Sequence, residues 1–574
     1  MSSASFCISM RFHSVVFASN IDCRFIAIDY TAGGKIKGFL TDTNQLSRII
    51  YLNQLPVINK IKFERMLYNQ SLPNFSDDQQ EGDSKNLKIV HLTSVDTGGA
   101  GKAAYRLNTG LFKQGYDSTL LVVSKSIKDE TIKVIEPADE SGEQNDFWLK
   151  QWNNCQSGVR DYPNKPEGFE IFTDINSGIE LNKIDDIKNA DIINLHWTAG
   201  LLDSVYMQLA FFNKPVAWTL HDMNAFTGGC HYSDGCEKYK NGCGACPQLG
   251  SNDKNDLSHQ IWLKKLETYK NLNLTIITPS KWLAECAAQS PLFFNSLIDV
   301  IPNGFPMNIY QPNSTSQNIK GLEFLSSKKL ILFGADYETN RKGFNYLLSA
   351  LEILSKQITD FKIVLGVFGC FPINYKSPDN CTLINYGKID DENELAGIYN
   401  NADVFVLPSI EDNLPNVVIE ALACGLPVVG VNIGGVKEQV DHKKNGYLAQ
   451  AKNVDDLAEG IRWVLFESNY LELKVNSRTK ALKEYSSETQ TERYYKLYKN
   501  IIRNSKTNSL PINIVIDDLF NKAEELIQAN ENRKAKEVLS FLLEKDPDNL
   551  NYLNDLAVNY ILSKDYINAN QVIQ

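Results

Sequence analysis

Two acidic side chains lie eight positions apart in the stretch 403–430, which reads DVFVLPSIEDNLPNVVIEALACGLPVVG. Asp412 follows an apolar stretch, and Glu420 lies in the helix expected after Pro415, because proline is tolerated in the first turn of a helix. That turn also offers free N–H groups to an anion. A loop acid here can accept hydrogen bonds from sugar hydroxyls, and a helix acid can accept two from a ribose diol. The alternative is an acid that favours the helix dipole and a solvated glutamate.

A pair of cations and a histidine also follow apolar stretches, as Asp412 does. Arg341 and Lys342 lie between an apolar stretch and a helical one. There they can clamp a diphosphate by charge-assisted hydrogen bonds, or they form a solvated basic pair. His221 follows the apolar stretch 216–220. We expect it at the carboxyl end of a strand, where ligands bind in α/β folds. The alternative is a turn histidine that caps nearby backbone.

Four of the eleven cysteines lie close together, at Cys230, Cys236, Cys243 and Cys246. Five, six and two residues separate them, and the closing Cys-x-x-Cys is a common chelating pair. Four thiolates would suit a structural Zn²⁺ that braces the loop after His221. The alternative is a set of buried thiols with one reversible disulfide.

The chain between 88 and 505 alternates apolar strands with helical stretches, which predicts βαβ units and parallel sheets. A turn signal at 302–304 divides this region. We therefore expect two Rossmann-like lobes, 88–302 and 303–505, which face a cleft. Ligands in such folds bind at the carboxyl ends of the strands.

The region 513–574 is predicted to be helical and repetitive. Ala523 and Ala557 are 34 positions apart, as are Ala535 and Ala569. This period resembles that of tetratricopeptide repeats and indicates a surface for a protein partner. Two unrelated amphipathic helices are the alternative. Because the sequence stops within a predicted helix, we expect the repeat region to be truncated.

Composition narrows the class of protein. Apolar residues make up 43% of the chain and the formal net charge is −11, so a nucleic-acid binder is not expected. No apolar run is long enough to span a membrane, and the N-terminus has no secretory signal pattern. We expect a cytoplasmic protein; the alternative is a peripheral protein at the inner face of the membrane.

The motif around Asp412 resembles the acid-x7-acid signature of family 4 of retaining glycosyltransferases, which have the GT-B fold. Ala421, Gly425 and Pro427 also match that signature. The resemblance implies that Asp412 contacts the transferred sugar and Glu420 the ribose, and it extends the substrate-binding set to Asn413 and Leu414. Lys342 matches the family's lysine. The family's arginine position holds Ala335, and Arg341 is the expected replacement.

The same resemblance implies roles for two glycine-rich segments. The segment 96–102 lacks the pattern of a Walker A loop, and it lacks the acid that a dinucleotide-binding fold requires after the second strand. We interpret its Gly99 and Gly101 as a loop beneath the donor phosphates. Gly434 and Gly435 let backbone approach a phosphate, or form a plain turn.

The stretch from 194 to 197 and the cysteine-rich segment resemble bacterial capsule and exopolysaccharide transferases, and this resemblance covers about residues 88–505. A histidine at the place of His221 contacts the donor sugar in that family. Residues 1–69 resemble part of the C-terminal lobe of polysaccharide pyruvyl transferases, and the polar segment 70–87 is predicted to be a linker.

The resemblance implies retaining transfer of a sugar from a UDP- or GDP-sugar to a glycan or lipid-linked acceptor. His221, Asp412, Lys342 and Arg341 are the expected catalytic residues, and no cofactor is expected at the reaction centre. Two alternatives stay open: a sugar-nucleotide epimerase of the same fold, and a non-catalytic scaffold with a repeat tail.

Overall fold

A computed structural model describes most of the chain after residue 86. The described ranges are 87–135, 144–167, 171–312, 328–337, 339–358, 360–370, 378, 380–507 and 512–573. Nearer the N-terminus it describes three short strands, β1 (Cys7–Ser9), β2 (Phe25–Asp29) and β3 (Ile49–Tyr51), which pair in parallel. The rest of the predicted pyruvyl-transferase-like segment and nearly all of the linker lie outside the described residues.

The first lobe is built on a seven-stranded parallel sheet with the order β10-β9-β8-β7-β4-β5-β6. Its central strands are almost wholly buried, because helices cover both faces of the sheet, and most of their residues are therefore apolar. Buried polar exceptions include His91 of β4 and Asn194 of β7. The order reverses between β4 and β7, which is where ligands bind in such sheets. The strands are β4 (Lys88–Val95), β5 (Asp117–Ser124), β6 (Ile132–Val134), β7 (Ile192–Leu195), β8 (Pro215–Thr219), β9 (Asn273–Thr278) and β10 (Leu297–Val300).

The helices of this lobe are α4 (Gly98–Lys113), α5 (Gln144–Cys155), α6 (Asp185–Lys188), α7 (Ser204–Ala210), α8 (Leu257–Tyr269) and α9 (Lys281–Ala288). Six short 3-10 turns join them: η3 (Ser157–Asp161), η4 (Leu181–Lys183), η5 (Asn224–Phe226), η6 (Lys238–Asn241), η7 (Pro247–Leu249) and η8 (Pro291–Phe293). Three of these turns, η5 to η7, lie in residues 222–250, the cysteine-rich segment, which contains no longer helix and no strand.

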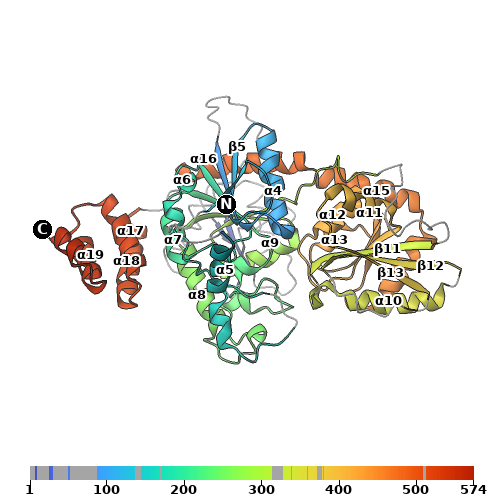
Figure 1. The fold of residues 1–574 in the computed structure, drawn as a ribbon, viewed down its shortest axis with the longest axis horizontal. Helices are drawn as coiled ribbons and strands as arrows, with labels where there is room; N and C mark the ends of the chain where they lie inside the picture. The colour runs from blue at the N-terminus through green and yellow to red at the C-terminus, as the bar shows by residue number, and fades with distance from the viewer. Residues whose placement is uncertain are drawn as a thin grey trace.

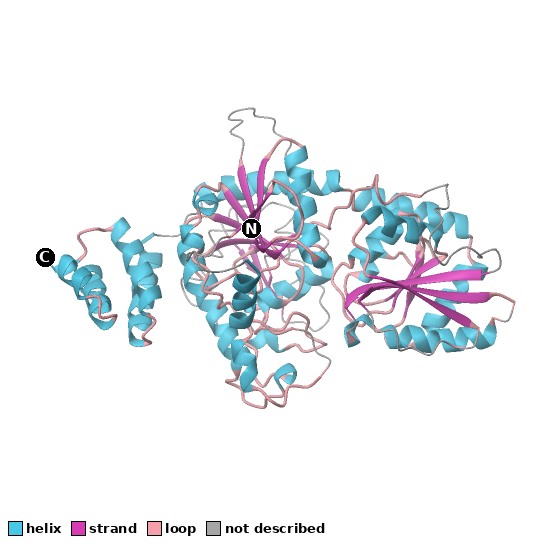
Figure 2. Cartoon of the chain, viewed as in Figure 1, coloured by secondary structure: helices cyan, strands magenta, loops and turns pink. Residues whose placement is uncertain are grey.

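The second lobe is built around a twisted sheet (Figure 2). The sheet is parallel, and its six strands have the order β13-β12-β11-β14-β15-β16. Its order reverses between β11 and β14. The strands are β11 (Lys328–Tyr337), β12 (Lys362–Cys370), β13 (Cys381–Gly387), β14 (Val404–Leu407), β15 (Val428–Val431) and β16 (Gly446–Ala449). The helices and turns are η9 (Asn340–Lys342), α10 (Phe344–Gln357), α11 (Glu392–Asn401), α12 (Asn416–Ala423), α13 (Val436–Gln439), α14 (Val454–Arg462), the π-helical turn η10 (Trp463–Glu467) and α15 (Tyr470–Glu484). Two Rossmann-like lobes are thus confirmed.

The helix α16 (Ser487–Thr507) packs on the first lobe, although the sequence prediction placed residues up to 505 in the second. Tyr494 and Tyr498 are fully buried in that lobe's core. The Tyr498 hydroxyl accepts a hydrogen bond from Asn194 Nδ2 at 2.7 Å, and the Tyr494 hydroxyl lies 3.1 Å from Thr219 Oγ1. By packing, the boundary of the second lobe therefore falls before α16.

The C-terminal helices form a separate layer beside α7, at one end of the molecule (Figure 1). They are α17 (Ile512–Gln528), α18 (Asn532–Lys545), α19 (Leu550–Leu562) and α20 (Tyr566–Ile573). The alanines that define the 34-residue period are buried: Ala523, Ala535, Ala557 and Ala569. The helical tail is confirmed, and its assignment to tetratricopeptide repeats stays a prediction.

Candidate functional site

The loops that follow β11 and β14 bring three of the predicted catalytic residues into contact. The Asp412 carboxylate lies 2.8 Å from Lys342 Nζ and 3.3 Å from Arg341 Nη1. Burial by itself would raise the pKa of Asp412, but the two cations outweigh it and hold that pKa below its ordinary value. These side chains meet because the sheet order reverses between β11 and β14, which leaves room between the two loops.

Glu420 lies on the buried face of α12, one turn into the helix and eight positions after Asp412. Its carboxylate accepts a hydrogen bond from the Tyr399 hydroxyl at 2.9 Å and lies 3.8 Å from Arg106 Nη2 of the first lobe. Arg106 also forms an ion pair with Glu392 and stacks over Phe305. Burial raises the pKa of Glu420, against the effect of Arg106 and Tyr399. Glu420, the residue predicted to bind the ribose, therefore contacts side chains of both lobes.

Sequence reasoning missed Arg106. It lies on α4, the helix that begins with the glycine loop, and its side chain is 8% exposed. The signal was present, since an arginine on the apolar face of an amphipathic helix needs a buried partner. Its two acidic partners, Glu392 and Glu420, are more than 280 positions away in the sequence, so only the tertiary structure identifies them.

The two predicted glycine segments differ in what they approach. Gly99 lies opposite α12, and its carbonyl accepts a hydrogen bond from Asn416 Nδ2 at 3.1 Å. Gly101 lies against its own strand, because a Cβ there would meet the Val95 carbonyl oxygen at 2.5 Å. At Gly434 and Gly435 the close approach is to protein backbone: a Cβ would meet the Asp412 carbonyl oxygen at 1.9 Å and the Asn413 carbonyl oxygen at 1.7 Å. This pair therefore supports the acidic loop.

Asn413 and Leu414 have different surroundings. The Asn413 side chain joins the lobes, since its Oδ1 accepts from Ser280 Oγ at 2.6 Å and its Nδ2 donates to the His221 carbonyl at 3.1 Å. Leu414 is buried in the hydrophobic core of the second lobe. The expectation that Leu414 binds substrate is therefore limited to its backbone, because its side chain packs with apolar neighbours.

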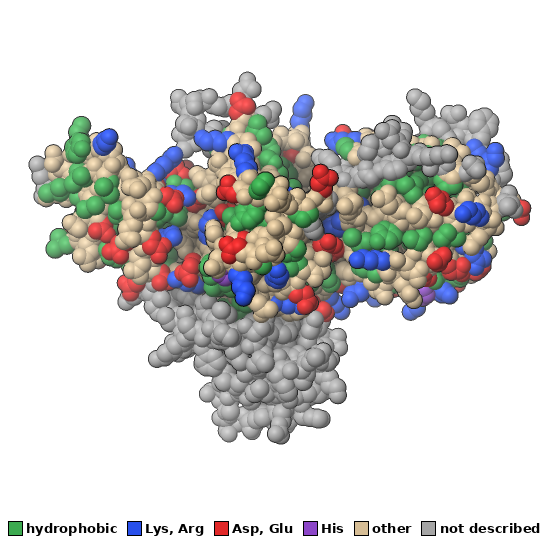
Figure 3. Space-filling model, turned by 90° about the horizontal axis from the view of Figure 1, so that it is seen from below, with side chains coloured by type: hydrophobic (Ala, Val, Ile, Leu, Met, Phe, Trp, Pro, Cys, Tyr) green, Lys and Arg blue, Asp and Glu red, His purple; other side chains and the backbone are tan. Residues whose placement is uncertain are grey.

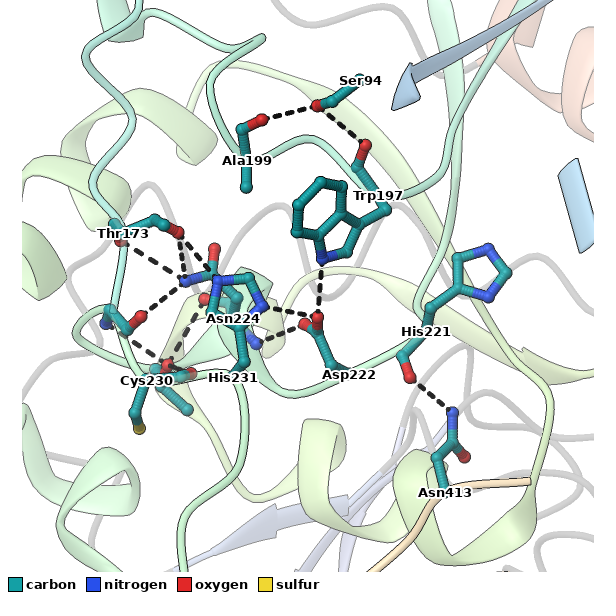
Figure 4. A network of polar contacts seen from close by, with 12 residues as sticks. Ser94, Thr173, Trp197, Ala199, His221, Asp222, Asn224, Cys230, His231 and Asn413 are labelled. Atoms are coloured by element: carbon teal, nitrogen blue, oxygen red, sulfur yellow. Dashed lines mark hydrogen bonds and ion pairs between the residues drawn. The ribbon is translucent and has the colours of Figure 1, made fainter. Parts of the chain in front are cut away.

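His221 is located where the prediction placed it, directly after β8 and beside Asn413. Figure 4 shows its ring turned away from the polar network of the neighbouring Asp222. Asp222 accepts hydrogen bonds from His231 Nδ1 at 2.6 Å and Trp197 Nε1 at 3.1 Å. Burial would raise the pKa of Asp222, but His231 holds it below the ordinary value. This network ties the end of β8 to the cysteine-rich segment.

The cysteine-rich segment also contacts the second lobe. The Arg341 guanidinium stacks over the Tyr232 ring, 3.9 Å from its centre. Glu411 accepts hydrogen bonds from the Asp234 N–H at 2.8 Å and Ser233 Oγ at 3.2 Å. Arg341 is therefore held between Asp412 and an aromatic ring of the other lobe. Tyr232 and Glu411 are further residues that the sequence analysis did not assign.

The four cysteines of this segment are free thiols that line one small pocket: Cys230, Cys236, Cys243 and Cys246. Burial raises the pKa of Cys230, and it raises the pKa of Cys243 to about 12. Within the described ranges, no three His, Cys, Asp or Glu side chains are arranged to hold a metal ion. Zinc binding would require the thiols to turn toward one centre, and it stays a prediction.

Comparisons with known proteins identify a matching family model and similar sequences. Residues 315–486 match the family model "Glycosyl transferases group 1". The chain is similar to the putative colanic acid biosynthesis glycosyl transferase WcaC of Escherichia coli K12, with 28% identity over 296 residues, 50% of this chain and 68% of that protein. It is also similar to N,N'-diacetylbacillosaminyl-diphospho-undecaprenol alpha-1,3-N-acetylgalactosaminyltransferase of Campylobacter jejuni, with 35% identity over 112 residues, 19% of this chain and 30% of that protein.

Among solved structures, the sucrose-phosphate synthase of Thermosynechococcus elongatus has a similar fold, with a TM-score of 0.50 and 17% identity. That similarity covers 72% of this chain and 99% of the other, and at this identity it concerns the fold alone. No helix in the described part of the chain is long and apolar enough to cross a membrane.

Proposed function

We propose, from the premise that residues 315–486 form a group 1 glycosyl transferase domain, that the protein transfers a sugar from a nucleotide-sugar to a glycan or lipid-linked acceptor. One observation carries the proposal. Asp412, Lys342 and Arg341 form a single cluster, Glu420 lies one turn into the helix α12 that follows Asp412, and His221 lies across the lobe boundary beside Asn413. A sugar, a diphosphate and a ribose can each find a partner there.

The roles follow from charge and position. Lys342 and Arg341 would neutralise the departing diphosphate, and Glu420 would accept hydrogen bonds from the ribose hydroxyls. Both cations now face the Asp412 carboxylate, so a bound diphosphate would compete with Asp412 for them. Asp412 would then be free to accept hydrogen bonds from the sugar. Catalysis would come from positioning and charge stabilisation, without a protein nucleophile.

We propose that the transfer retains the anomeric configuration, with the leaving diphosphate taking the acceptor's proton on the same face of the sugar. The similarity to a colanic acid enzyme and to an enzyme that acts on an undecaprenol-linked sugar supports a role in cell-surface polysaccharide biosynthesis. A UDP- or GDP-sugar is the proposed donor. An epimerase of the same fold remains the second candidate, since its nucleotide-sugar would use the same cluster.

The test begins with a thermal-shift screen of the full chain against UDP-, GDP- and ADP-sugars. A ligand that binds the folded state raises the melting temperature by mass action. The donor that binds is then incubated with and without membrane-lipid or oligosaccharide acceptors, and the products are followed by mass spectrometry. Transfer that requires an acceptor supports the proposal. Conversion of the donor to an isomer of equal mass without acceptor indicates the epimerase, and no binding by any sugar nucleotide indicates a scaffold.

A further inference from the structure

Three histidines form a continuous chain from the interior of the first lobe to the proposed site. His91 Nδ1 lies 3.0 Å from His196 Nε2, and His196 Nδ1 lies 3.1 Å from His221 Nε2. The residues come from three neighbouring strands: His91 is within β4, His196 follows β7 and His221 follows β8. The rings of His196 and His221 are stacked, with centroids 5.4 Å apart. The row of histidines therefore starts at β4, beside the point where the sheet order reverses.

All three rings are held in the neutral form. His91 is fully buried and His196 is 3% exposed. Burial lowers the pKa of His91 to about 3 and that of His221 to about 4. Burial, together with its two histidine neighbours, also holds the pKa of His196 well below its ordinary value. Each ring thus has one N–H donor and one bare nitrogen acceptor, so the proton on one ring dictates the proton on the next.

Only two proton arrangements satisfy both hydrogen bonds. In the first, His91 donates to His196, His196 donates to His221, and His221 keeps its proton on Nδ1. In the second every bond is reversed, and His221 Nδ1 is bare. The two arrangements differ at His91 Nε2, the buried end of the row of histidines, which has no partner among the described residues. The first arrangement leaves a lone pair there, and the second leaves an N–H group.

The surroundings of His91 Nε2 favour the first of these two proton arrangements. Buried backbone N–H groups without a partner are rarer in proteins than buried acceptors that lack one, and by the same reasoning the bare nitrogen is the less costly end. His221 Nδ1 has no hydrogen-bond partner among the described residues, so its proton is available to a ligand.

We propose that His196 and His91 are positioning residues that hold His221 as the Nδ1–H tautomer, so that it presents a hydrogen-bond donor to the transferred sugar. This inference rests on the proposed function for the identity of the ligand, and on the histidine geometry for the tautomer. The donor does not switch off near neutral pH, because none of the three rings gains a second proton there.

The test reads the tautomer directly in the full chain labelled with ¹⁵N-histidine. The chain has seven histidines, which single substitutions can assign. We expect His221 to carry its proton on Nδ1, and His196→Leu to convert it to a mixture of both tautomers. His442→Gln, at an exposed histidine of the second lobe, is the matched control and leaves the His221 signal unchanged. A proton on Nε2 in the unmodified protein, or an unaltered signal in His196→Leu, overturns the proposal.

Two further variants guard against misfolding of His196→Leu. His196→Asn places an amide nitrogen near the position of Nδ1, so it keeps a donor toward His221 and restores the tautomer. His91→Leu removes the ring that sets the direction of the hydrogen bonds among the three histidines, so a mixture of His221 tautomers is again expected. An unchanged His221 signal in a folded His91→Leu protein contradicts the coupling of the three rings.

A kinetic readout separates positioning from general structure. His196→Leu should lower kcat/KM for the donor sugar about 2- to 10-fold, the worth of one neutral hydrogen bond, while the Kd of UDP or GDP alone is unchanged. An equal loss of diphosphate binding would mean a merely structural role and overturns the proposal. If the tautomers are as expected but the unmodified protein shows no sugar transfer, the proposed function fails and the histidine chain stands.

Discussion

At the scale of single residues, the candidate site is held together by charges that are already paired before a ligand binds. Lys342 faces Asp412, and Glu420 is within reach of Arg106. Buried charges need such partners, since an unpaired one is strongly destabilising. A donor molecule must therefore replace contacts that already exist. This arrangement favours a ligand that brings its own negative charge for Lys342 and its own hydroxyl groups for Glu420.

We expect Glu420→Ala and Lys342→Ala each to lower kcat/KM strongly while the protein stays folded. Each change removes a charge-assisted hydrogen bond worth about 1.5–3 kcal/mol, which corresponds to roughly tenfold to over a hundredfold. Glu459→Ala and Lys437→Ala, which alter exposed residues of the same lobe, are the controls. Unchanged turnover in both site variants would refute these assignments, and thermal unfolding checks that the fold is intact.

The buried histidines should make stability depend on pH. Their folded pKa values lie below the ordinary value of 6.5, at about 3 for His91 and about 4 for His221. As the pH falls, the histidines of the unfolded chain take up protons before those of the folded chain do. The contribution of the neutral histidines to stability is therefore fully present above pH 6.5 and is lost as the pH falls below it. Each histidine costs up to about 1.4 kcal/mol per pH unit in this window. We expect the melting temperature to fall between pH 6.5 and 5, and less steeply in His91→Leu; equal slopes would contradict this account.

At the scale of elements, the loops after β14 and β15 support each other. The Gly435 N–H donates to the Asp412 carbonyl at 3.1 Å, and no side chain fits between these two loops. The glycine pair is thus required by the approach of two backbones. It shapes the acidic loop from behind, and a change there would act on Asp412 without any contact with the ligand.

We expect Gly435→Ala to destabilise the protein by about 1–3 kcal/mol, the usual cost of overpacking a filled site. The added methyl group would meet the Asn413 carbonyl oxygen at 1.7 Å. Gly99→Ala is the matched comparison, since its methyl group would meet only Asn416 Nδ2 at 3.7 Å. Denaturant unfolding measures both variants. A Gly435→Ala protein as stable as Gly99→Ala would show that the two loops can separate at little cost.

The cysteine-rich segment remains a proposed zinc site. Lys265, whose pKa burial lowers to about 8, lies close enough to Cys230 and Cys243 to offset thiolate charge. We expect about one zinc per chain in protein purified without a metal-affinity step, measured by elemental analysis, and a lower melting temperature after chelation. Cys286→Ser, outside the pocket, is the control for Cys243→Ser. Metal-free protein of equal stability would exclude the site.

At the scale of the whole molecule, the tail is joined to the first lobe by apolar and ionic contacts. Val205, Tyr206 and Leu209 of α7 belong to the same hydrophobic cluster as α17 and α18. Lys534 Nζ lies 3.1 Å from the Asp203 carboxylate, which is fully buried and caps α7. The outer helices α19 and α20 instead expose apolar side chains, and Figure 3 shows hydrophobic side chains at that end of the molecule. The tail is therefore anchored on one side.

We expect Lys534→Ala to lower stability by about 1.5–3 kcal/mol, because Asp203 loses a charged partner. Lys522→Ala, which removes an exposed pair within α17, should have little effect. Deletion of residues 508–574 would uncover the apolar face of α7, so a larger loss of melting temperature and some aggregation are expected. A deletion protein as stable as the full chain would show that the tail is an independent unit.

Much of the architecture was readable from the sequence because it depends on local pattern. Alternating apolar strands and helices predicted both parallel sheets, and the eight-residue spacing located Asp412 and Glu420 on either side of the start of α12. The positions of His221 and Lys342 after strands followed from the same pattern. Strand ends and helix starts leave local signals, since they depend on residues only a few positions apart.

The tertiary structure decided which of these residues have partners. His91 and His196 are 105 positions apart, and Arg106 and Glu420 belong to different lobes. The return of α16 to the first lobe and the burial of Leu414 were equally invisible to local pattern. The physical reason is the same in each case: periodicity records which face of an element is buried, whereas the identity of the facing element depends on packing between segments far apart in the chain.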